Sequence, residues 1–196
     1  ACDTFSAIGV DYFYPFVYED NKGNLTGVLV DDLQEAMGRV GMKVDIQTTK
    51  PWKRILQDFN KGDVDIVIGA YWNAERAKKY LISEALGVEK ISVFVKAGKQ
   101  FPLSSFRDLI GRTGLRLLGG SLGQEFDTYA EKNLDFSRIS TNDQITKMLA
   151  HDRADYGIQG HAQGLHFIKS LGLESKVDVL PWPILSNKVH VLISKT

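Results

Sequence analysis

Arg76 is the residue whose type and position most need a chemical explanation. It lies in the first turn of a predicted helix, at the positive end of the helix dipole, where a cation is mildly unfavourable. A forked guanidinium that binds a carboxylate or a phosphate would explain this position. The alternative is a solvated surface arginine paired with Glu75 or another neighbour, and this stretch alone leaves the two interpretations equally open.

The segment before Arg76 predicts where such a site would lie in the fold. Residues 64–68 form a short apolar run rich in β-branched residues, which predicts a strand covered on both faces. The run stops at Gly69 and Ala70, two small residues that allow close approach to the backbone, and Tyr71 follows them. Ligands of open α/β sheets bind outside the carboxyl ends of the strands, so we expect a ligand here.

The elements around this segment alternate between strands and helices, which predicts a parallel α/β unit. The expected strands cover 6–10, 44–48 and 64–68, and the expected helices cover 31–40 and 52–61. The aromatic stretch 11–18 is predicted to be a loop because Pro15 would interrupt a strand. Residues 19–24 predict a hairpin turn around Gly23.

The alternation begins again at Phe101 and predicts a second unit. Its expected elements, with the strands that flank it, are strands at 91–95, 115–118, 156–158, 177–180 and 189–193 and helices at 106–110, 121–133, 145–149 and 161–170, the third helix preceded by a capping box at 141–144. The prediction is therefore two lobes, 1–94 with 186–196 and 95–185, joined by two hinge crossovers. A small ligand would bind in the cleft between them.

Composition narrows the classes of partner. The chain of 196 residues has 24 basic and 24 acidic residues, intermixed and with zero net charge, which argues against nucleic acid or an anionic membrane as the main partner. No apolar run approaches the length of a membrane span and no signal peptide is present, so either it was removed or there never was one. Cys2 is the one cysteine, which excludes an intramolecular disulfide.

Metal and nucleophile chemistry are both disfavoured. His161 and His166 are five residues apart, about 140° around a helix, and no cysteine accompanies them. Ser121 lies in GGSLG, which has the spacing of a hydrolase nucleophile elbow. The chain is short for that fold, and two lobes explain the same glycines as backbone room for a ligand. We therefore expect no metal, no cofactor and no catalytic residue.

Four segments, read in order, resemble a known family: DYFYPFVYEDNKGNLTGVLVDDL, PWKRILQDFNKGDVDIVIGAYWNAER, GGSLGQEFDTYAE and KMLAHDRADYGIQ. They are similar to type II periplasmic binding proteins, specifically bacterial extracellular solute-binding family 3, the branch associated with polar amino acids. The resemblance implies a two-lobe α/β Venus-flytrap fold. It also implies a periplasmic or extracellular location after removal of a signal peptide, with a lipid anchor at the N-terminus as an alternative.

The resemblance also implies a ligand site. Asp11 and Tyr14 match first-loop positions that face the ligand, and Trp52 matches an aromatic residue that stacks on it. Arg76 matches the arginine that binds the α-carboxylate. Ser121 matches a hydroxyl-bearing position of the second lobe that helps to bind the same group with nearby amides. The complete expected set is Asp11, Tyr14, Trp52, Gly69, Tyr71, Arg76, Ser121, Gly123 and Gln159.

The chain departs from the family at one position that matters for the ligand. Relatives that bind α-amino acids hold the α-ammonium with an aspartate one residue beyond the position of Gln159, where this chain has Gly160. An ammonium without a carboxylate partner is costly to desolvate. Glu84, Asp11 or Gln159 could replace the aspartate. An α-amino acid and a different carboxylate-bearing or aromatic molecule therefore both remain open.

Two further departures concern the ends of the chain. Family members usually continue past the strand at 189–193 into one or two helices, whereas this sequence stops at Thr196, so a truncated or a compact first lobe is expected. The branch often pairs an N-terminal cysteine with one near the second strand, where this chain has Met42. Cys2 is therefore expected to be unpaired.

The function expected from the resemblance is binding without covalent chemistry. A monomer would take up a small carboxylate-bearing solute, such as an amino acid, and deliver it to an ABC transporter permease. The first alternative is a periplasmic sensory domain that signals to a membrane partner. The second is a dehydratase-like enzyme on the same fold, for which Glu84 and His161 are the candidate acids or bases.

Overall fold

The computed structural model describes residues 4–195, which divide into two compact units. The first unit runs to Gly87 and resumes at Lys188, and the second comprises residues 88–187. The chain therefore passes between the units in two strands, β8 (Gly87–Lys96) and β13 (Leu185–Ile193). The boundaries expected from the sequence, 94/95 and 185/186, fall within these strands, and the division into lobes at those positions stays a prediction. Cys2 lies outside the described residues.

The first unit contains the predicted parallel sheet. Its strands follow the order β13-β6-β1-β5, with β7 on the other side of β13. Strand β1 pairs in parallel with β5 and β6, while β13 pairs antiparallel with β6. The bounds are β1 (Thr4–Gly9), β5 (Lys43–Ile46), β6 (Ile66–Tyr71) and β7 (Leu81–Ile82). The strand–helix–strand–helix–strand prediction is confirmed.

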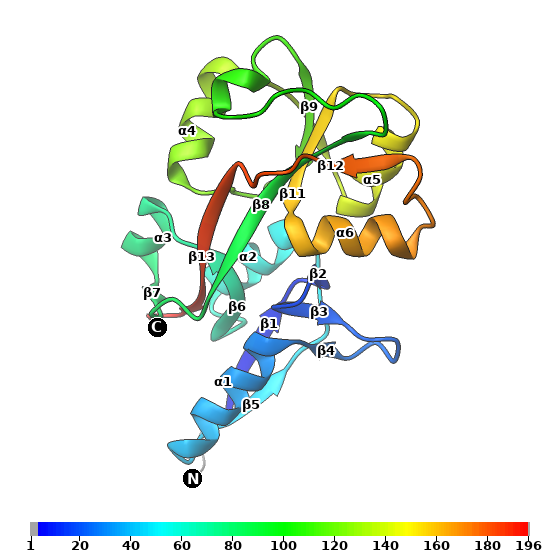
Figure 1. The fold of residues 1–196 in the computed structure, drawn as a ribbon. Helices are drawn as coiled ribbons and strands as arrows, with labels where there is room; N and C mark the ends of the chain where they lie inside the picture. The colour runs from blue at the N-terminus through cyan, green and yellow to red at the C-terminus, as the bar shows by residue number, and fades with distance from the viewer. Residues whose placement is uncertain (1–3, 196) are drawn as a thin grey trace. The chain divides into compact units, whose positions relative to one another are not determined.

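The described residues of this unit contain the helices α1 (Val28–Arg39), α2 (Trp52–Lys61) and α3 (Ala74–Lys79). Helix α2 has the predicted bounds, because Pro51 precedes it and Gly62 ends it in the left-handed conformation. Helix α1, which lies beside β5 (Figure 1), begins at Val28, before the predicted start. Gly27, with φ 124°, lets the chain turn into the helix there.

Strand β6 is longer than predicted and does not end at Ile68. The antiparallel register with β13 pairs Ala70 with His190 and Ile68 with Val191, so Gly69 is an extra residue on β6. Gly69 has φ 81°, the left-handed conformation of a β-bulge glycine. The prediction that these small residues terminate the strand is wrong, since Gly69 bends a strand that continues to Tyr71.

The aromatic stretch forms a small antiparallel sheet and not the predicted loop. Its strands are β2 (Tyr12–Phe13), β3 (Val17–Glu19) and β4 (Leu25–Thr26), in the order β2-β3-β4. Pro15 lies in the turn between β2 and β3, where it removes no ladder hydrogen bond. The predicted hairpin turn around Gly23 is confirmed between β3 and β4.

The second unit has the strand order β10-β9-β11-β8, with β12 paired antiparallel to β8. Strands β9, β10 and β11 are parallel to one another, and β8 is antiparallel to β11. The bounds are β9 (Thr113–Leu117), β10 (Asp135–Ile139), β11 (Tyr156–Gly160), β12 (Val177–Val179), η1 (Phe106–Leu109), α4 (Gln124–Asn133), α5 (Asn142–Ala150) and α6 (His161–Ser170). Helix α6 matches the prediction at both ends, whereas β10 was not predicted.

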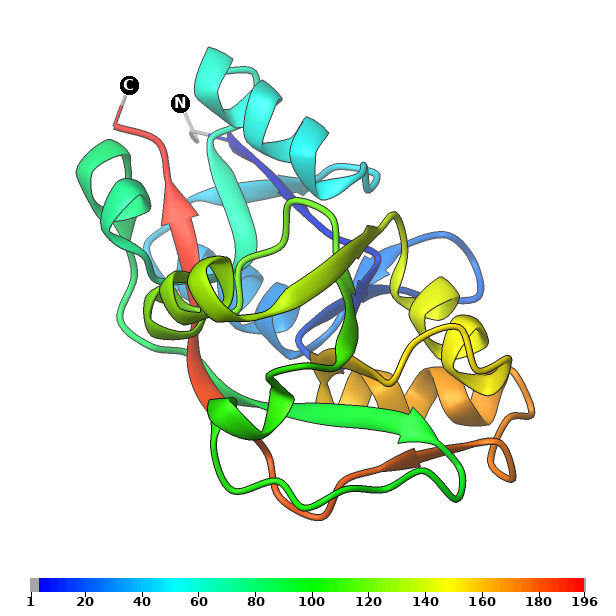
Figure 2. The same cartoon turned by 90° about the horizontal axis from the view of Figure 1, so that it is seen from above.

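Helices α5 and α6 lie side by side against this sheet (Figure 2). Leu115, Ile145, Leu149 and Phe94 form the buried core beneath them. The capping box predicted at 141–144 is wrong, because Thr141 precedes α5 without a side-chain capping bond. A box forms instead at the start of η1, between Ser105 and Asp108. No helix in the described part of the chain is long and apolar enough to cross a membrane.

Candidate functional site

The three parallel strands of the first unit end at one edge of its sheet, and the predicted ligand residues follow those ends. Asp11 comes after β1, Trp52 after β5 and Arg76 after β6. Parallel topology therefore brings residues from distant parts of the sequence to one edge. This is the edge at which open α/β sheets bind ligands.

Arg76 is a buried side chain. It is 8% exposed, its Nη1 donates to the Tyr71 carbonyl oxygen at 2.6 Å, and its guanidinium carbon lies 5.1 Å from the centroid of the Trp52 ring. Its backbone N–H donates to the side chain of Asn73 at 2.8 Å, which fixes the start of α3. Arg76 is therefore not a solvated surface arginine, and the neighbouring Glu75 pairs with Lys79 at 2.7 Å.

Trp52 forms the flat wall against which Arg76 lies. It is the first residue of α2 and is buried in the core of the unit. Its indole Nε1 is buried and has no hydrogen-bond partner among the described residues. A guanidinium near an indole face is attracted by the ring quadrupole, which favours the position of Arg76 beside Trp52.

The other predicted residues of this unit surround an aromatic cluster. The Tyr14 ring lies 5.0 Å from the Tyr18 ring, and the Tyr71 ring meets Phe13 edge-on at 5.8 Å, while Asp11 is exposed. A Cβ added at Gly69 would lie 2.9 Å from the Phe13 ring. The group that approaches Gly69 closely is thus a core phenylalanine, and contact of Gly69 with a ligand stays a prediction.

The predicted residues of the second unit include a hydrogen-bonded loop after β9. Ser121 Oγ donates to Asp127 Oδ2 at 2.5 Å and accepts from the Gly123 amide at 3.2 Å. Asp127 Oδ1 also accepts from Arg116 Nη2 at 2.7 Å, and Arg116 is buried. The Ser121 hydroxyl therefore organises the entry into α4. It faces a carboxylate and not a histidine, which argues against the nucleophile elbow.

Gln159 is a buried polar residue on β11. It is 2% exposed, its Nε2 donates to Thr146 Oγ1 at 3.2 Å, and its Oε1 is buried without a hydrogen-bond partner in the described part of the chain. His161, next along the chain after Gly160, shares a hydrogen bond of 2.9 Å between its Nδ1 and Ser92 Oγ. Parallel strands β9 and β11 place Ser121, Gln159 and Gly160 at the same edge of the sheet.

Glu89 is a buried acid outside the set of ligand residues predicted from the sequence. It is 4% exposed, and burial raises the pKa of its carboxyl to about 8. The sequence pattern of β8 could have predicted this burial. Residues two apart in a strand share a face, and Glu89 shares its face with Ile91 and Val93, both of which are fully buried. Glu84, one of the acids proposed from the sequence, is exposed.

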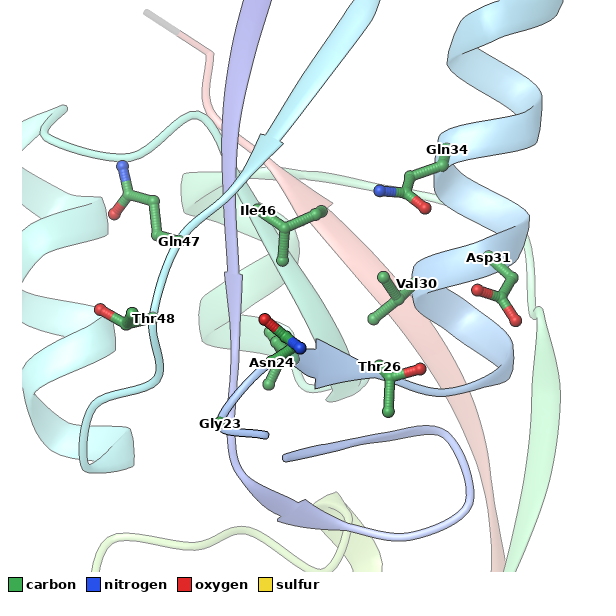
Figure 3. A pocket seen from close by; sticks show the side chains of 10 residues that line it. Gly23, Asn24, Thr26, Val30, Asp31, Gln34, Ile46, Gln47 and Thr48 are labelled. Carbon is green, nitrogen blue, oxygen red and sulfur yellow. The ribbon is translucent and has the colours of Figure 1, made fainter. Parts of the chain in front are cut away.

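The first unit also has a polar cavity of about 240 Å³ between α1, β5 and the β3–β4 hairpin (Figure 3). Val30 and Ile46 point toward one another in it (Figure 3). The lining residues are Gly23, Asn24, Leu25, Thr26, Val30, Asp31, Gln34, Ile46, Gln47 and Thr48. None of them is among the predicted ligand residues, so this cavity is separate from the Arg76 site.

Comparison with known proteins identifies the family. Residues 7–159 match the model of bacterial extracellular solute-binding proteins, family 3. The L-cystine-binding protein TcyJ of Escherichia coli is 27% identical over 138 residues, which are 69% of this chain and 50% of that protein. The chain thus spans about half the length of this curated relative.

Two solved structures have the same fold. A histidine kinase sensor domain with similarity to periplasmic binding proteins superposes with a TM-score of 0.83 at 20% identity, covering 99% of this chain and 83% of that one. An ancestral arginine-binding protein bound to arginine gives 0.82 at 21% identity, covering 98% and 84%. The predicted periplasmic-binding-protein fold is confirmed, and the chain belongs to the bacterial extracellular solute-binding proteins of family 3.

Proposed function

We propose that this protein binds a small carboxylate-bearing solute, an amino acid or a close analogue, and delivers it to an ABC transporter permease outside the cytoplasm. The observation that supports this most directly is the buried guanidinium of Arg76, oriented between the Tyr71 carbonyl and the Trp52 ring. A family of solute-binding proteins supplies the context for that site.

The geometry of Arg76 suits a carboxylate. A guanidinium has five N–H donors in a rigid fork, and a carboxylate accepts two of them side by side. The contact with Trp52 restricts the Arg76 side chain before the ligand arrives, so less side-chain entropy is lost on binding. Charge-assisted hydrogen bonds formed away from water are stronger than those at the surface.

The remaining residues have supporting roles in this proposal. Tyr14 is exposed and offers an aromatic face to the body of the solute, and Asp11 offers a carboxylate for a polar or cationic end. Ser121 and Gly123 contribute from the second unit through the loop that Asp127 holds in place. Binding by both units would make closure part of recognition.

The names of the relatives favour an amino acid. One is an L-cystine-binding protein and another was solved with arginine, and both molecules have an α-carboxylate. A sensory domain would use the same ligand site, but its closure on the solute would signal to a membrane partner instead of delivering the solute to a permease. The experiment below therefore tests binding, which delivery and sensing share.

Calorimetry and thermal unfolding with a ligand panel test the proposal. The panel contains amino acids, their deaminated analogues, small dicarboxylates and aromatic acids. A solute at about one hundred times its Kd should stabilise the protein by roughly 2.7 kcal/mol. Arg76→Ala should weaken binding on the order of 100-fold, because the ligand carboxylate then loses its charged partner.

Arg39→Ala is the matched control, because Arg39 is an exposed arginine of the same unit paired with Glu35 at 2.5 Å. It should bind the solute as the wild type does. Unchanged affinity of Arg76→Ala would show that the carboxylate binds elsewhere. A folded wild-type protein that responds to no member of the panel would overturn the solute class.

A further inference from the structure

Glu89 and Gly160 are fitted to each other in the second unit. Strand β8 pairs antiparallel with β11, with Ile91 opposite Gly160, so Glu89 lies just beyond the end of this pairing. A Cβ added at Gly160 would lie 1.8 Å from Glu89 Oε1 and 2.8 Å from its carboxyl carbon. The Glu89 carboxyl therefore fills the space that a side chain at position 160 would need.

The backbone at position 160 does not itself require glycine. Gly160 has φ −53° and ψ 136°, a conformation that any L-residue adopts. The space taken by Glu89 is thus the physical reason for the missing side chain. The carboxyl group of Glu89 on β8 therefore occupies the place of a side chain on β11.

This acid lies at the functional edge of the sheet. Gly160 is the last residue of β11 and directly precedes α6, and the loop that holds Ser121 follows the neighbouring parallel strand β9. Gln159, the preceding residue, has a buried Oε1 with no hydrogen-bond partner among the described residues. The buried side chains of Glu89 and Gln159 therefore both lie at the edge of the sheet where ligands of parallel sheets bind.

The protonation of the Glu89 carboxyl responds to its surroundings. Removal from water disfavours the charged form of a carboxyl group. Burial accordingly raises the pKa of Glu89 to about 8. A ligand cation placed against the carboxylate would favour its ionised form.

We propose that Glu89 is the acid of the second unit that contacts the solute, and that the solute therefore carries a primary ammonium in addition to its carboxylate. This inference rests on the proposed function and specifies its solute class. Among the acids proposed from the sequence to replace the missing aspartate, Glu84 is exposed and Asp11 belongs to the other unit. Glu89 is buried, and its carboxyl occupies the space next to Gly160.

Matched pairs of solutes test the proposal by calorimetry. The pairs are L-glutamate with glutarate, L-phenylalanine with 3-phenylpropionate, and L-arginine with 5-guanidinopentanoate. The wild type should bind at least one α-amine-bearing member more tightly than its deaminated partner. Glu89→Gln, which keeps the shape and removes the charge, should weaken the amine-bearing member on the order of tenfold or more. It should leave the deaminated partner unchanged.

A rescue variant separates charge recognition from packing. The double variant Glu89→Ala with Gly160→Asp moves the carboxylate from β8 to β11, into space that Glu89 has vacated. It should recover the preference for the amine-bearing member that Glu89→Ala alone loses. Gly160→Asp alone should lose affinity for both members, because its side chain meets the Glu89 carboxyl. If Glu89→Gln does not fold, the double variant decides the question by the same preference.

The outcomes distinguish this inference from the proposed function. Binding that depends on Arg76 but falls equally for both members of every pair in Glu89→Gln would overturn the role of Glu89 and leave the carboxylate site intact. Tighter binding of the deaminated members by the wild type would also overturn it. Binding that does not depend on Arg76 would instead overturn the proposed function.

Discussion

The guanidinium carbon of Arg76 lies 5.1 Å from the centroid of the Trp52 ring. The indole side chain has two roles in this arrangement, because it fills the core of the first unit and orients the arginine above it. Substitutions at position 52 can separate these roles by size and aromaticity.

Trp52→Ala should lower the free energy of unfolding by about 3 kcal/mol or more, because it leaves a large cavity. It should also weaken solute binding roughly tenfold beyond the effect of Trp52→Phe, which keeps an aromatic face for Arg76. Urea unfolding and calorimetry measure the two effects. Trp182→Ala is the control, since Trp182 is 73% exposed, and it should change neither quantity. Equal affinities of the Phe and Ala variants would contradict the orienting role of the ring.

Asp127→Asn should loosen the loop before α4. The carboxylate of Asp127 accepts from Arg116, from Ser121 and from the Leu122 amide at 3.3 Å. Loss of its charge should cost about 2 kcal/mol in the free energy of unfolding, because the buried Arg116 loses its ionic partner.

Glu35→Gln removes the acid of an exposed ion pair and should cost no more than about 0.5 kcal/mol in the same urea experiment. Faster amide hydrogen exchange around Gly123 in Asp127→Asn would confirm that the effect is local. Equal stabilities of the two variants would show that the Arg116–Asp127 pair does not stabilise this unit.

The raised pKa of Glu89 predicts a pH dependence of stability. The folded state keeps a proton on Glu89 up to about pH 8, whereas an unfolded glutamate loses it near its ordinary value of about 4.3. Between these values the folded state binds more protons, so the free energy of unfolding falls as pH rises, and the contribution becomes constant above about pH 8. Urea midpoints from pH 4 to pH 9 measure it.

Glu89→Gln removes this titration while the other ionisable groups, including the nearby His161, stay in place. The difference in free energy of unfolding between wild type and variant should therefore decline between about pH 4.3 and pH 8. If this difference does not change with pH over the interval, the pKa of Glu89 is not raised in the folded state.

Gly69→Ala should destabilise the first unit by about 1–3 kcal/mol, because φ 81° is strained for alanine and the new Cβ would meet the Phe13 ring at 2.9 Å. Gly38 in α1 offers a matched control, since nothing lies within 4 Å of its added Cβ and its φ is not positive. Gly38→Ala should stabilise the protein by about 0.4–1 kcal/mol. A neutral Gly69→Ala would mean that the bulge relaxes without cost.

Much of the fold could be predicted from local signals in the sequence. Helix α2 has the predicted bounds because Pro51 and Gly62 specify its two ends locally. Strand β10 was missed because it is an edge strand with mostly polar side chains, so its identity depends on pairing with β9 and not on its own pattern. The small sheet at 12–26 was missed because two-residue strands leave no periodicity.

The candidate site was harder to predict, because its geometry depends on contacts between distant segments. From the sequence alone, a ligand-binding role and a position on the solvated surface are equally consistent with Arg76. Its guanidinium lies beside Trp52, which α2 brings to the same edge of the sheet. Glu89 was visible as an acid on an inward-facing strand position, but only the fold places its carboxyl against Gly160.

The fit between Glu89 and Gly160 constrains how the acid of this site could change position during evolution. A side chain can be introduced at position 160 only after the one at position 89 has become smaller, because the two compete for one volume. A stepwise route that moves the carboxylate from β8 to β11 must therefore shorten the side chain at position 89 before it adds one at position 160.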